Sequence, residues 1–292
     1  MKAELTVLLA GSDGQLGTAL RRTAPDTVRL LTPARAELDL LRVDTMNAAV
    51  QAARPDVVIN AAAYTAVERA ESEPALAHAI NAEGATALAA AAEGAGARMI
   101  HISTDFVFDG RASRPYRPTD PAAPLSVYGA SKLAGERGVA ACTRGRALVI
   151  RTAWLYGAGA PNFVTTMLGR MREGAVRVVS DQVGSPTWSR SLAAAIWSAV
   201  ARPALSGLHH WADAGVASWY DFAVAIQEEA LALGLLERAV SIDPIQTQDY
   251  PTQARRPPYS VLDVHETRIA LALPPVHWRT NLRRMLAETT GG

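Results

Sequence analysis

The sequence predicts an α/β protein: a doubly wound parallel sheet with helices on both faces, plus a smaller, interleaved C-terminal lobe. Three observations predict it. The first half of the chain alternates short β-branched runs with long alanine-rich stretches, as strands alternate with crossover helices in a parallel sheet. A glycine-rich turn directly follows the first such run. After about residue 155 the spacing becomes irregular and prolines accumulate, which indicates a second region built differently.

Composition excludes several classes of protein. With 292 residues, 49% hydrophobic and 20% charged, the chain can bury a sizeable core. A net charge of +1 gives no general attraction to nucleic acid or to an anionic membrane. Cys142, the single cysteine, cannot form an internal disulfide and fits a reducing compartment. The six histidines are scattered and no cysteine cluster occurs, so no metal site is expected.

The start of the chain also bears on location. Met1–Glu4 leads into a short apolar run that ends at a glycine, which is typical of a first strand rather than of a signal peptide. No stretch of about 20 uncharged apolar residues occurs, so no membrane-spanning helix is expected. We therefore expect a cytoplasmic protein.

Residues 1–155 are predicted to form one domain. Short apolar runs flanked by helix breakers are typical of strands buried on both faces. The predicted strands are Leu5–Ala10, Val28–Leu31, Val57–Ala61, Met99–Ile102 and Leu148–Arg151. A helix is expected from the glycine turn to about Arg22, and the clearest later helices are Glu73–Glu93 and Tyr128–Ala141.

Residues 156–292 are predicted to form most of the second lobe. Its expected helices are Asn162–Arg172, Ser191–Ala201, Trp219–Leu233 and two more near the C-terminus, and its expected strands are Val176–Ser180 and Gly207–Asp213. No flexible linker separates the halves. We therefore expect the chain to cross between them more than once, with residues of about 175–187 returning to the first domain.

The glycine turn is a candidate phosphate-binding site. Gly11, Gly14 and Gly17 surround Gln15 and Leu16 in the pattern G-x-x-G-x-x-G. In a Rossmann-type domain, such glycines permit a tight turn, close approach of a pyrophosphate, and close helix packing. The helix that follows offers free N–H groups and a partial positive charge to the phosphates. In this strand–turn–helix context, dinucleotide binding is favoured over a purely structural turn.

The end of the second predicted strand bears on the choice of nucleotide. No carboxylate stands at this strand end to hold the ribose hydroxyls of NAD. Arg35 stands there instead and could pair with a 2′-phosphate, which favours NADPH, with NADH still possible. The alternative is that Arg35 is an ordinary surface residue. Asp39 and Leu40 follow, where they could contact an adenine.

Two further strand ends carry candidate residues. Ala61, Ala62 and Ala63 end the third strand, where small side chains let the backbone lie against a flat nucleotide, although they could equally serve helix packing. Thr104 and Asp105 end the fourth strand, and Asp105 could alternatively cap the next turn. Ligands of doubly wound sheets bind outside the carboxyl ends of the strands. These residues are therefore expected in one crevice with the glycine turn.

Tyr128 and Lys132 supply a candidate proton donor. Spaced four residues apart on a predicted helix, they share one face. A neighbouring ammonium is expected to lower the tyrosine pKa and make it a usable proton donor to a carbonyl. Thr104 would add a hydrogen bond to the same carbonyl oxygen. By itself, this spacing arises by chance in many helices.

In this order, the motifs resemble those of the extended short-chain dehydrogenase/reductases, and more narrowly the dTDP-4-dehydrorhamnose reductase family. The segments that carry the resemblance are Ser103–Gly110, Tyr128–Glu136, Arg151–Gly157, Asn162–Phe163, Asp181–Thr187 and Pro251–Pro257. The resemblance implies a Rossmann-type nucleotide-binding domain and a lobe that binds a nucleotide sugar. It also implies reduction of a dTDP-4-keto-6-deoxy sugar at its keto group.

The resemblance implies roles for individual residues. Tyr128 would be the proton donor, Lys132 would orient the cofactor, and Thr104 would hold the keto oxygen. The substrate residues implied are Thr104, Asp105, Phe106, Tyr128, Trp154, Asn162 and Arg256, of which Trp154 and Asn162 would lie near the sugar and Arg256 near the diphosphate. Thr65 would contact the nicotinamide or the sugar.

Alternatives remain open. Phe106 stands where the family commonly has tyrosine, so reduction of a different dTDP-4-keto-6-deoxyhexose is one alternative. A second is a non-catalytic NADP-binding subunit resembling the regulatory subunit of methionine adenosyltransferase, although the intact Thr104, Tyr128 and Lys132 argue against it. An NAD-containing epimerase of nucleotide sugars is a third. The protein could be a monomer or a homodimer.

Overall fold

A computed structural model describes residues 5–290; the Met1–Glu4 segment considered above lies outside the described residues. A parallel sheet of six strands combines five strands from the first half of the chain with β10 from the second half, in the order β10-β5-β4-β3-β1-β2. Its strands are β1 (Leu5–Ala10), β2 (Val28–Leu31), β3 (Val57–Asn60), β4 (Arg98–Thr104), β5 (Leu148–Thr152) and β10 (Gly207–Trp211). The central strand β3 is buried along its whole length, as expected when helices cover both faces of a sheet.

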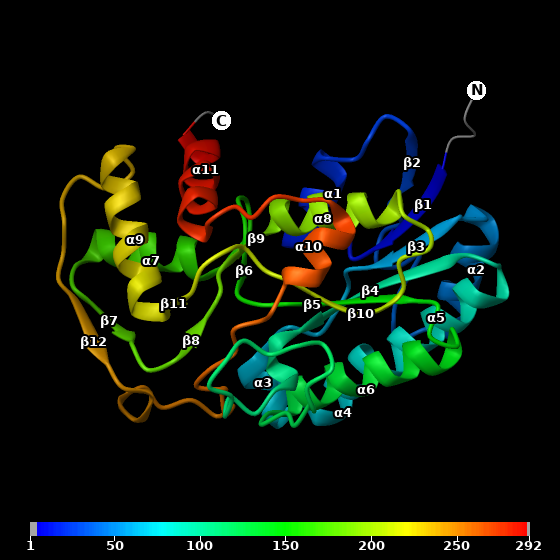
Figure 1. The fold of residues 1–292 in the computed structure, drawn as a ribbon, viewed down its shortest axis with the longest axis horizontal. Helices are drawn as coiled ribbons and strands as arrows, with labels where there is room; N and C mark the ends of the chain where they lie inside the picture. Colours follow the sequence, from blue (N-terminus) through cyan, green and yellow to red (C-terminus); the bar gives the residue numbers. More distant parts are fainter. Residues whose placement is uncertain (1–4, 291–292) are drawn as a thin grey trace.

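Helices cover both faces of this sheet, α1 and α8 above it and α5 and α6 below it in Figure 1. The upper layer is α1 (Gln15–Arg22) and α8 (Ser189–Val200), and the lower layer is α2 (Val43–Ala53), α5 (Ala85–Gly94) and α6 (Val127–Cys142). Leucine and alanine side chains of the helices pack on the valine and isoleucine side chains of the strands. The predicted doubly wound α/β fold is confirmed.

The predicted helix Glu73–Glu93 is more irregular than expected. It consists of α4 (Pro74–His78), a π-helical segment (Ala79–Gly84) and α5. The short α3 (Val67–Ser72) precedes it; neither α2 nor α3 was predicted. π-Helical segments are rare and frequently lie at functional sites.

The C-terminal lobe, on the left in Figure 1, is built from short elements around its own core. Three two-stranded sheets contribute: β6 (Leu155–Tyr156) with β9 (Thr187–Trp188), β8 (Val183–Gly184) with β11 (Ala217–Ser218), and β7 (Val176–Val179) with β12 (Ile242–Ile245). The lobe helices are α7 (Phe163–Glu173), α9 (Trp219–Ala232) and α11 (Trp278–Thr290), and α10 (His265–Leu271) packs beside β10.

The expectation that residues of about 175–187 return to the first domain is wrong for the main sheet. β7 pairs with β12 inside the lobe, and its side chains alternate between buried Val176 and exposed Arg177. That alternation suits a strand with one face in solvent, not one covered on both sides. The returning segment is α8 followed by β10, which joins the sheet beside β5. The division of the chain near residue 155 stays a prediction.

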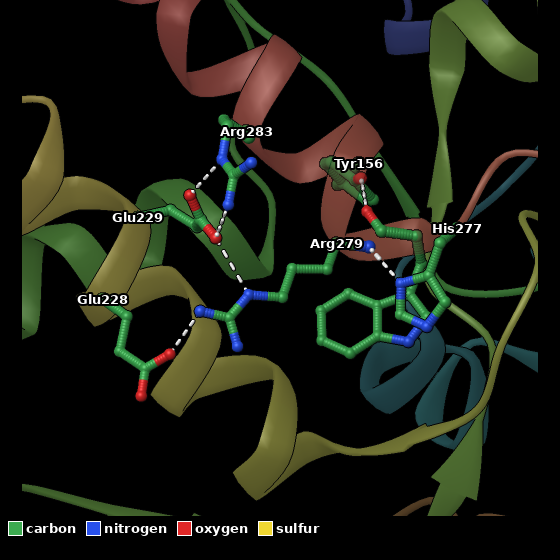
Figure 2. Close-up of polar contacts among 7 residues, drawn as sticks. Tyr156, Glu228, Glu229, His277, Arg279 and Arg283 are labelled. Carbon is green, nitrogen blue, oxygen red and sulfur yellow. Dashed lines mark hydrogen bonds and ion pairs between the residues drawn. The ribbon is translucent and has the colours of Figure 1, made fainter.

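Ion pairs connect two helices of the lobe (Figure 2). Glu229 on α9 accepts hydrogen bonds from Arg283 at 2.6 and 2.9 Å and from Arg279 at 2.8 Å. The Tyr156 hydroxyl donates to the Trp278 carbonyl at 3.4 Å, tying β6 to the start of α11. Over residues 5–290, no helix is both long enough and apolar enough to cross a membrane.

Candidate active site

The glycine turn lies directly against the end of β3. Gly11 has a φ of +80°, and a Cβ there would stand 2.5 Å from the Ala62 nitrogen. A Cβ at Gly17 would stand 2.1 Å from the Gly11 carbonyl oxygen. Asn60 holds the Ala62 N–H through its Oδ1 at 3.1 Å. Glycine is therefore required at Gly11 and Gly17 for close backbone packing.

The start of α1 is suited to a diphosphate. A Cβ at Gly14, the residue before the helix, would meet only the Gly11 carbonyl oxygen, at 3.6 Å. No side chain caps the helix, so the N–H groups of its first turn, from Gln15 and Leu16 on, are available to an anion. The cradle fits the phosphates of a dinucleotide.

The residues expected around the adenosine occupy the loop after β2. Arg35 is exposed and makes no hydrogen bond or ion pair within the described part of the chain. Asp39 accepts from the Leu41 N–H at 3.0 Å, so one carboxylate oxygen holds its own turn. Leu40 is buried in the core beneath α5 and thus serves packing. Arg35 is the residue of this group with its charge free for a ligand.

Thr104, Tyr128 and Lys132 meet at the carboxyl end of β4. A hydrogen bond joins the hydroxyls of Thr104 and Tyr128. The Thr104 hydroxyl also donates to Asp105 Oδ1 at 3.1 Å, and the Lys132 Nζ donates to the Ile102 carbonyl at 2.7 Å. Thr104 lies opposite Thr152 in the β4–β5 register. The structure therefore brings the three predicted catalytic residues together at one sheet edge.

The pKa of Tyr128 shifts in the direction opposite to the one expected. Burial raises the pKa of Tyr128 to about 12, with the Asp105 carboxylate adding to the rise, while the Thr104 hydrogen bond works against it. Burial lowers the pKa of Lys132 to about 8. The expectation that Lys132 lowers the tyrosine pKa is wrong in this structure, because the ammonium is engaged by Ile102 and desolvation dominates. Tyr128 therefore keeps its proton at neutral pH.

Asn81, which sequence reasoning missed, connects the cofactor loop to the catalytic helix. In the π-helical segment, its side chain accepts from the Tyr64 N–H at 2.8 Å and donates to the Tyr64 carbonyl and to the Ser131 hydroxyl, both at 3.0 Å. Tyr64 follows Ala63, and Ser131 precedes Lys132. The signal was present in the sequence, since asparagine is a poor helix former and stands here in an alanine-rich helical stretch.

Two further residues surround the cluster. The Phe106 ring packs edge-on against Tyr128, with centroids 5.6 Å apart. Asp105 is 2% exposed, and among the described residues its Oδ2 has no hydrogen-bond partner. Burial raises the pKa of Asp105 to about 6, against the lowering effect of the Ser260 and Thr104 hydroxyls. Asp105 is thus a buried acid beside the candidate proton donor.

Trp154 lies just beyond Thr152, with its indole packed against residues of the lobe. Its φ of +47° is unusual for a non-glycine residue. Trp219 of α9 stacks on it at 3.5 Å between ring centroids and 5° between planes. A Cβ at Gly184 would stand 2.6 Å from the Trp154 Cε2. The lobe therefore clamps the indole, leaving it partly exposed.

Asn162, Thr65 and Arg256 have different surroundings. Asn162 caps α7 and donates from Nδ2 to Gly157 and Ala160 carbonyls and to Gln15 Oε1, so its amide links the lobe to the phosphate turn. Thr65 is exposed just before α3. Arg256 pairs with Glu68 of α3 at 2.5 Å. The substrate contacts expected of Asn162 and Arg256, and the nicotinamide or sugar contact expected of Thr65, stay predictions.

No group of three or more metal-binding side chains occurs among residues 5–290. Cys142, also within the described chain, is a free thiol.

The chain was compared with known proteins. A family model described as the RmlD substrate binding domain matches residues 5–290. The chain is 43% identical over 288 residues to a dTDP-4-dehydrorhamnose reductase of Burkholderia thailandensis, covering 94% of this chain and 96% of that protein.

Two solved structures superpose closely. One is a dTDP-4-dehydrorhamnose reductase of Clostridium acetobutylicum, with a TM-score of 0.91 and 36% identity over 98% of this chain and 100% of that one. The other is a dTDP-4-dehydrorhamnose reductase of Bacillus anthracis in complex with NADP, with a TM-score of 0.91 and 34% identity over 98% and 99% of the two chains.

Proposed function

This chain belongs to the dTDP-4-dehydrorhamnose reductase family, and from that membership we propose that it reduces dTDP-4-dehydro-6-deoxy-L-mannose to dTDP-L-rhamnose with NADPH. The observation that carries the proposal is the meeting of Thr104, Tyr128 and Lys132 at the carboxyl end of β4. The related enzyme from Bacillus anthracis was solved with NADP. That complex supports NADPH as the cofactor of this chain.

The residues of the cluster divide the work. When bound, the cofactor supplies a hydride to the C4 carbonyl carbon of the sugar. Tyr128 gives its proton to the carbonyl oxygen as negative charge develops there, and Thr104 donates a hydrogen bond to the same oxygen. The Lys132 ammonium, buried and held by the Ile102 carbonyl, would orient the cofactor beside them. One hydride and one proton thus convert the ketone to an alcohol.

The cofactor would bind along the carboxyl ends of the strands of the main sheet. The phosphate turn at Gly11, Gly14 and Gly17 and the uncapped start of α1 would hold the diphosphate. Arg35 would pair with the 2′-phosphate. Ala61, Ala62, Ala63 and Thr65 would lie along the nicotinamide half, and Lys132 would contact its ribose. Asp39 would lie at the adenosine end.

The substrate would lie between the sheet edge and the lobe. Phe106 and the rim of Trp154 would contact the sugar, and Arg256 the diphosphate. Asp105 and Asn162 would border the same crevice. A non-catalytic NADP-binding subunit would also need the phosphate turn, but it would not need a partly buried proton donor beside a buried ammonium.

A direct assay tests the proposal. Purified protein is mixed with NADPH and enzymatically prepared dTDP-4-dehydrorhamnose, and loss of reduced nicotinamide absorbance is followed. Turnover with dTDP-L-rhamnose as the product, identified by chromatography against an authentic standard, is expected. Tight NADPH binding without turnover would refute the proposal in favour of the regulatory subunit. Turnover that yields a different dTDP-deoxysugar would favour the alternative reductase.

A further inference from the structure

Two carboxylates of the short helix α3, Glu71 and Glu68, accept hydrogen bonds from two different parts of the chain. Glu71 Oε1 accepts from the Val127 N–H at 2.8 Å, and Val127 is the first residue of the catalytic helix α6. Glu68, almost one turn earlier, faces residues 251–258, which we call the strap. α3 therefore connects the strap to the helix that carries Tyr128.

Glu68 contacts the strap through both of its carboxylate oxygens. Its Oε2 accepts from the Gln253 N–H at 2.7 Å and from the Ala254 N–H at 3.2 Å. Its Oε1 lies 2.5 Å from the Arg256 Nη1. Burial acts to raise the Glu68 pKa, but the Ala254 and Arg256 contacts outweigh it and the pKa is lowered. Glu68 thus stays ionised and contacts three residues of the strap, Gln253, Ala254 and Arg256.

The strap packs against the loop that follows the reaction cluster. A Cβ at Gly110, in the loop that follows Thr104 and Asp105, would stand 2.4 Å from the Pro258 side chain. The Pro258 carbonyl accepts from the Val183 N–H of the lobe at 2.8 Å. In Figure 1 the orange segment after β12 runs along the lower side of the molecule from the lobe toward α3. The strap therefore joins the lobe to the sheet edge.

Arg256 is only partly used by the protein. Its Nη1 pairs with Glu68 and lies 3.4 Å from the Ala254 carbonyl oxygen. Within residues 5–290, its Nε and Nη2 donate to no protein group, and the side chain is 24% exposed. These two nitrogens form one edge of the guanidinium, which matches two oxygens of a phosphate. Glu68 thus fixes one side of the fork and leaves the other side free.

We propose that Glu68 is a positioning residue that holds the strap and aims the free edge of Arg256 at the diphosphate of the nucleotide sugar. The inference rests on the proposed function, because it takes the diphosphate of that substrate as the ligand. Glu68 touches neither the sugar nor the cofactor. Its loss weakens substrate binding while leaving the proton donor in place.

The test compares two glutamate-to-glutamine variants. Glu68→Gln removes the charge and keeps the shape, and we expect the KM for the nucleotide sugar to rise roughly 10- to 100-fold, the range of a charge-assisted hydrogen bond. The turnover number and the NADPH Kd should change less than about twofold. Glu83→Gln is the matched control, since Glu83 is exposed and its side chain makes no hydrogen bond or ion pair within the described residues. A wild-type KM in Glu68→Gln overturns the inference.

A second pair of measurements separates alignment from a general loss of structure. Arg256→Lys keeps the charge and removes the fork, so it should also raise the KM. Combining it with Glu68→Gln should raise the KM by less than the product of the two single effects, because both act through one contact. Strictly multiplicative effects contradict the proposal.

Amide hydrogen exchange of the strap can be measured without substrate, so it tests the role of Glu68 independently of the reaction. Glu68→Ala should speed exchange at the Gln253 and Ala254 amides, while Glu83→Ala should leave them at the wild-type rate. Unchanged exchange in Glu68→Ala overturns the inference even when no sugar is reduced. Conversely, wild-type protein that does not reduce the sugar refutes the proposed function alone. The two failures are therefore distinguishable.

Discussion

The sheet region and the C-terminal lobe each bury a glutamate against arginine, but they do so in different surroundings. In the sheet region, Glu136 of α6 binds Arg151 of β5 through two hydrogen bonds of 2.7 and 2.8 Å, and the side chains are 7% and 3% exposed. In the lobe, Glu229 is 4% exposed, whereas Arg279 and Arg283 are 42% and 62% exposed (Figure 2).

The difference matters because the buried ion pair between Glu136 and Arg151 lies on the helix and the strand next to the reaction cluster. Glu136 lies one helical turn after Lys132 on α6, and Arg151 precedes Thr152, the strand partner of Thr104. The ion pair therefore fixes the catalytic helix against the strands that end in the site. The arginines of the lobe are solvated by water, so their ion pairs with Glu229 can break without leaving an unpaired buried arginine. Under the proposed function, the sheet region would carry the chemistry and the lobe would take part in substrate recognition.

The largest effect should come from the proton donor in the rigid region. Tyr128→Phe removes only a hydroxyl, so the turnover number should fall roughly 100- to 10,000-fold, the usual contribution of such proton transfer. Melting temperature and NADPH affinity should stay near the wild-type values, because the ring and its contact with Phe106 remain. Steady-state rates and a thermal melt check this. Wild-type turnover would place the proton donor elsewhere.

The next effect compares the two ion pairs directly. Glu136→Ala leaves Arg151 buried without its carboxylate and should lower the free energy of unfolding by about 3–5 kcal/mol. Glu229→Ala should cost clearly less, because water can solvate Arg279 and Arg283. Urea unfolding of both variants measures the difference. Equal losses would show that solvent access does not distinguish the two regions.

The sheet region was more predictable from sequence than the lobe for a physical reason. Strands such as Val57–Asn60 are buried on both faces, so their apolar runs are visible in the sequence. The two-residue strands β6, β8, β9 and β11 are too short for any periodicity. β7 was predicted but assigned to the wrong region, because four residues do not specify a pairing partner.

The candidate site shows the same limit. Thr104, Tyr128 and Lys132 could be predicted because strand ends and helical spacing place them. The partners of Asn81, Glu68 and Trp154 lie 17 or more residues away along the chain. An asparagine in an alanine-rich helical stretch can draw attention to Asn81, but no local pattern identifies the distant partners of these residues. The raised pKa of Tyr128, opposite to the expected direction, and the lowered pKa of Lys132 likewise depend on burial, which spacing alone does not reveal.

A pH-dependent effect tests the junction between the two regions. Asp213 follows β10 and accepts from the Trp188 N–H of the lobe at 3.1 Å. Burial raises its pKa from 3.8 to about 6, although hydrogen bonds from Ser191 and Asn281 act to lower the pKa. A raised acid pKa means that this group contributes stability below about pH 4 and loses it as pH rises through 6.

The magnitude of that loss follows from the shift. About two pKa units correspond to about 3 kcal/mol. Asp213→Asn should therefore unfold with a free energy that declines less between pH 4 and pH 7 than that of the wild type. The slope that remains should include Asp105, whose pKa is also raised to about 6. Urea unfolding at several pH values measures both slopes, and identical slopes would contradict the assignment to Asp213.

The smallest effect concerns the exposed rim of the rigid region, where Arg35 stands without a protein partner in the described chain. If its guanidinium binds the 2′-phosphate of NADPH, Arg35→Ala should weaken NADPH binding on the order of 10- to 100-fold. NADH lacks that phosphate, so its affinity should barely change. Arg29→Ala is the control, since Arg29 is an exposed arginine on β2 itself. Fluorescence titration with both cofactors measures the four affinities. Equal binding of NADPH and NADH by the wild type would show that Arg35 is an ordinary surface residue. The loop after β2 would then not determine whether the protein prefers NADPH or NADH.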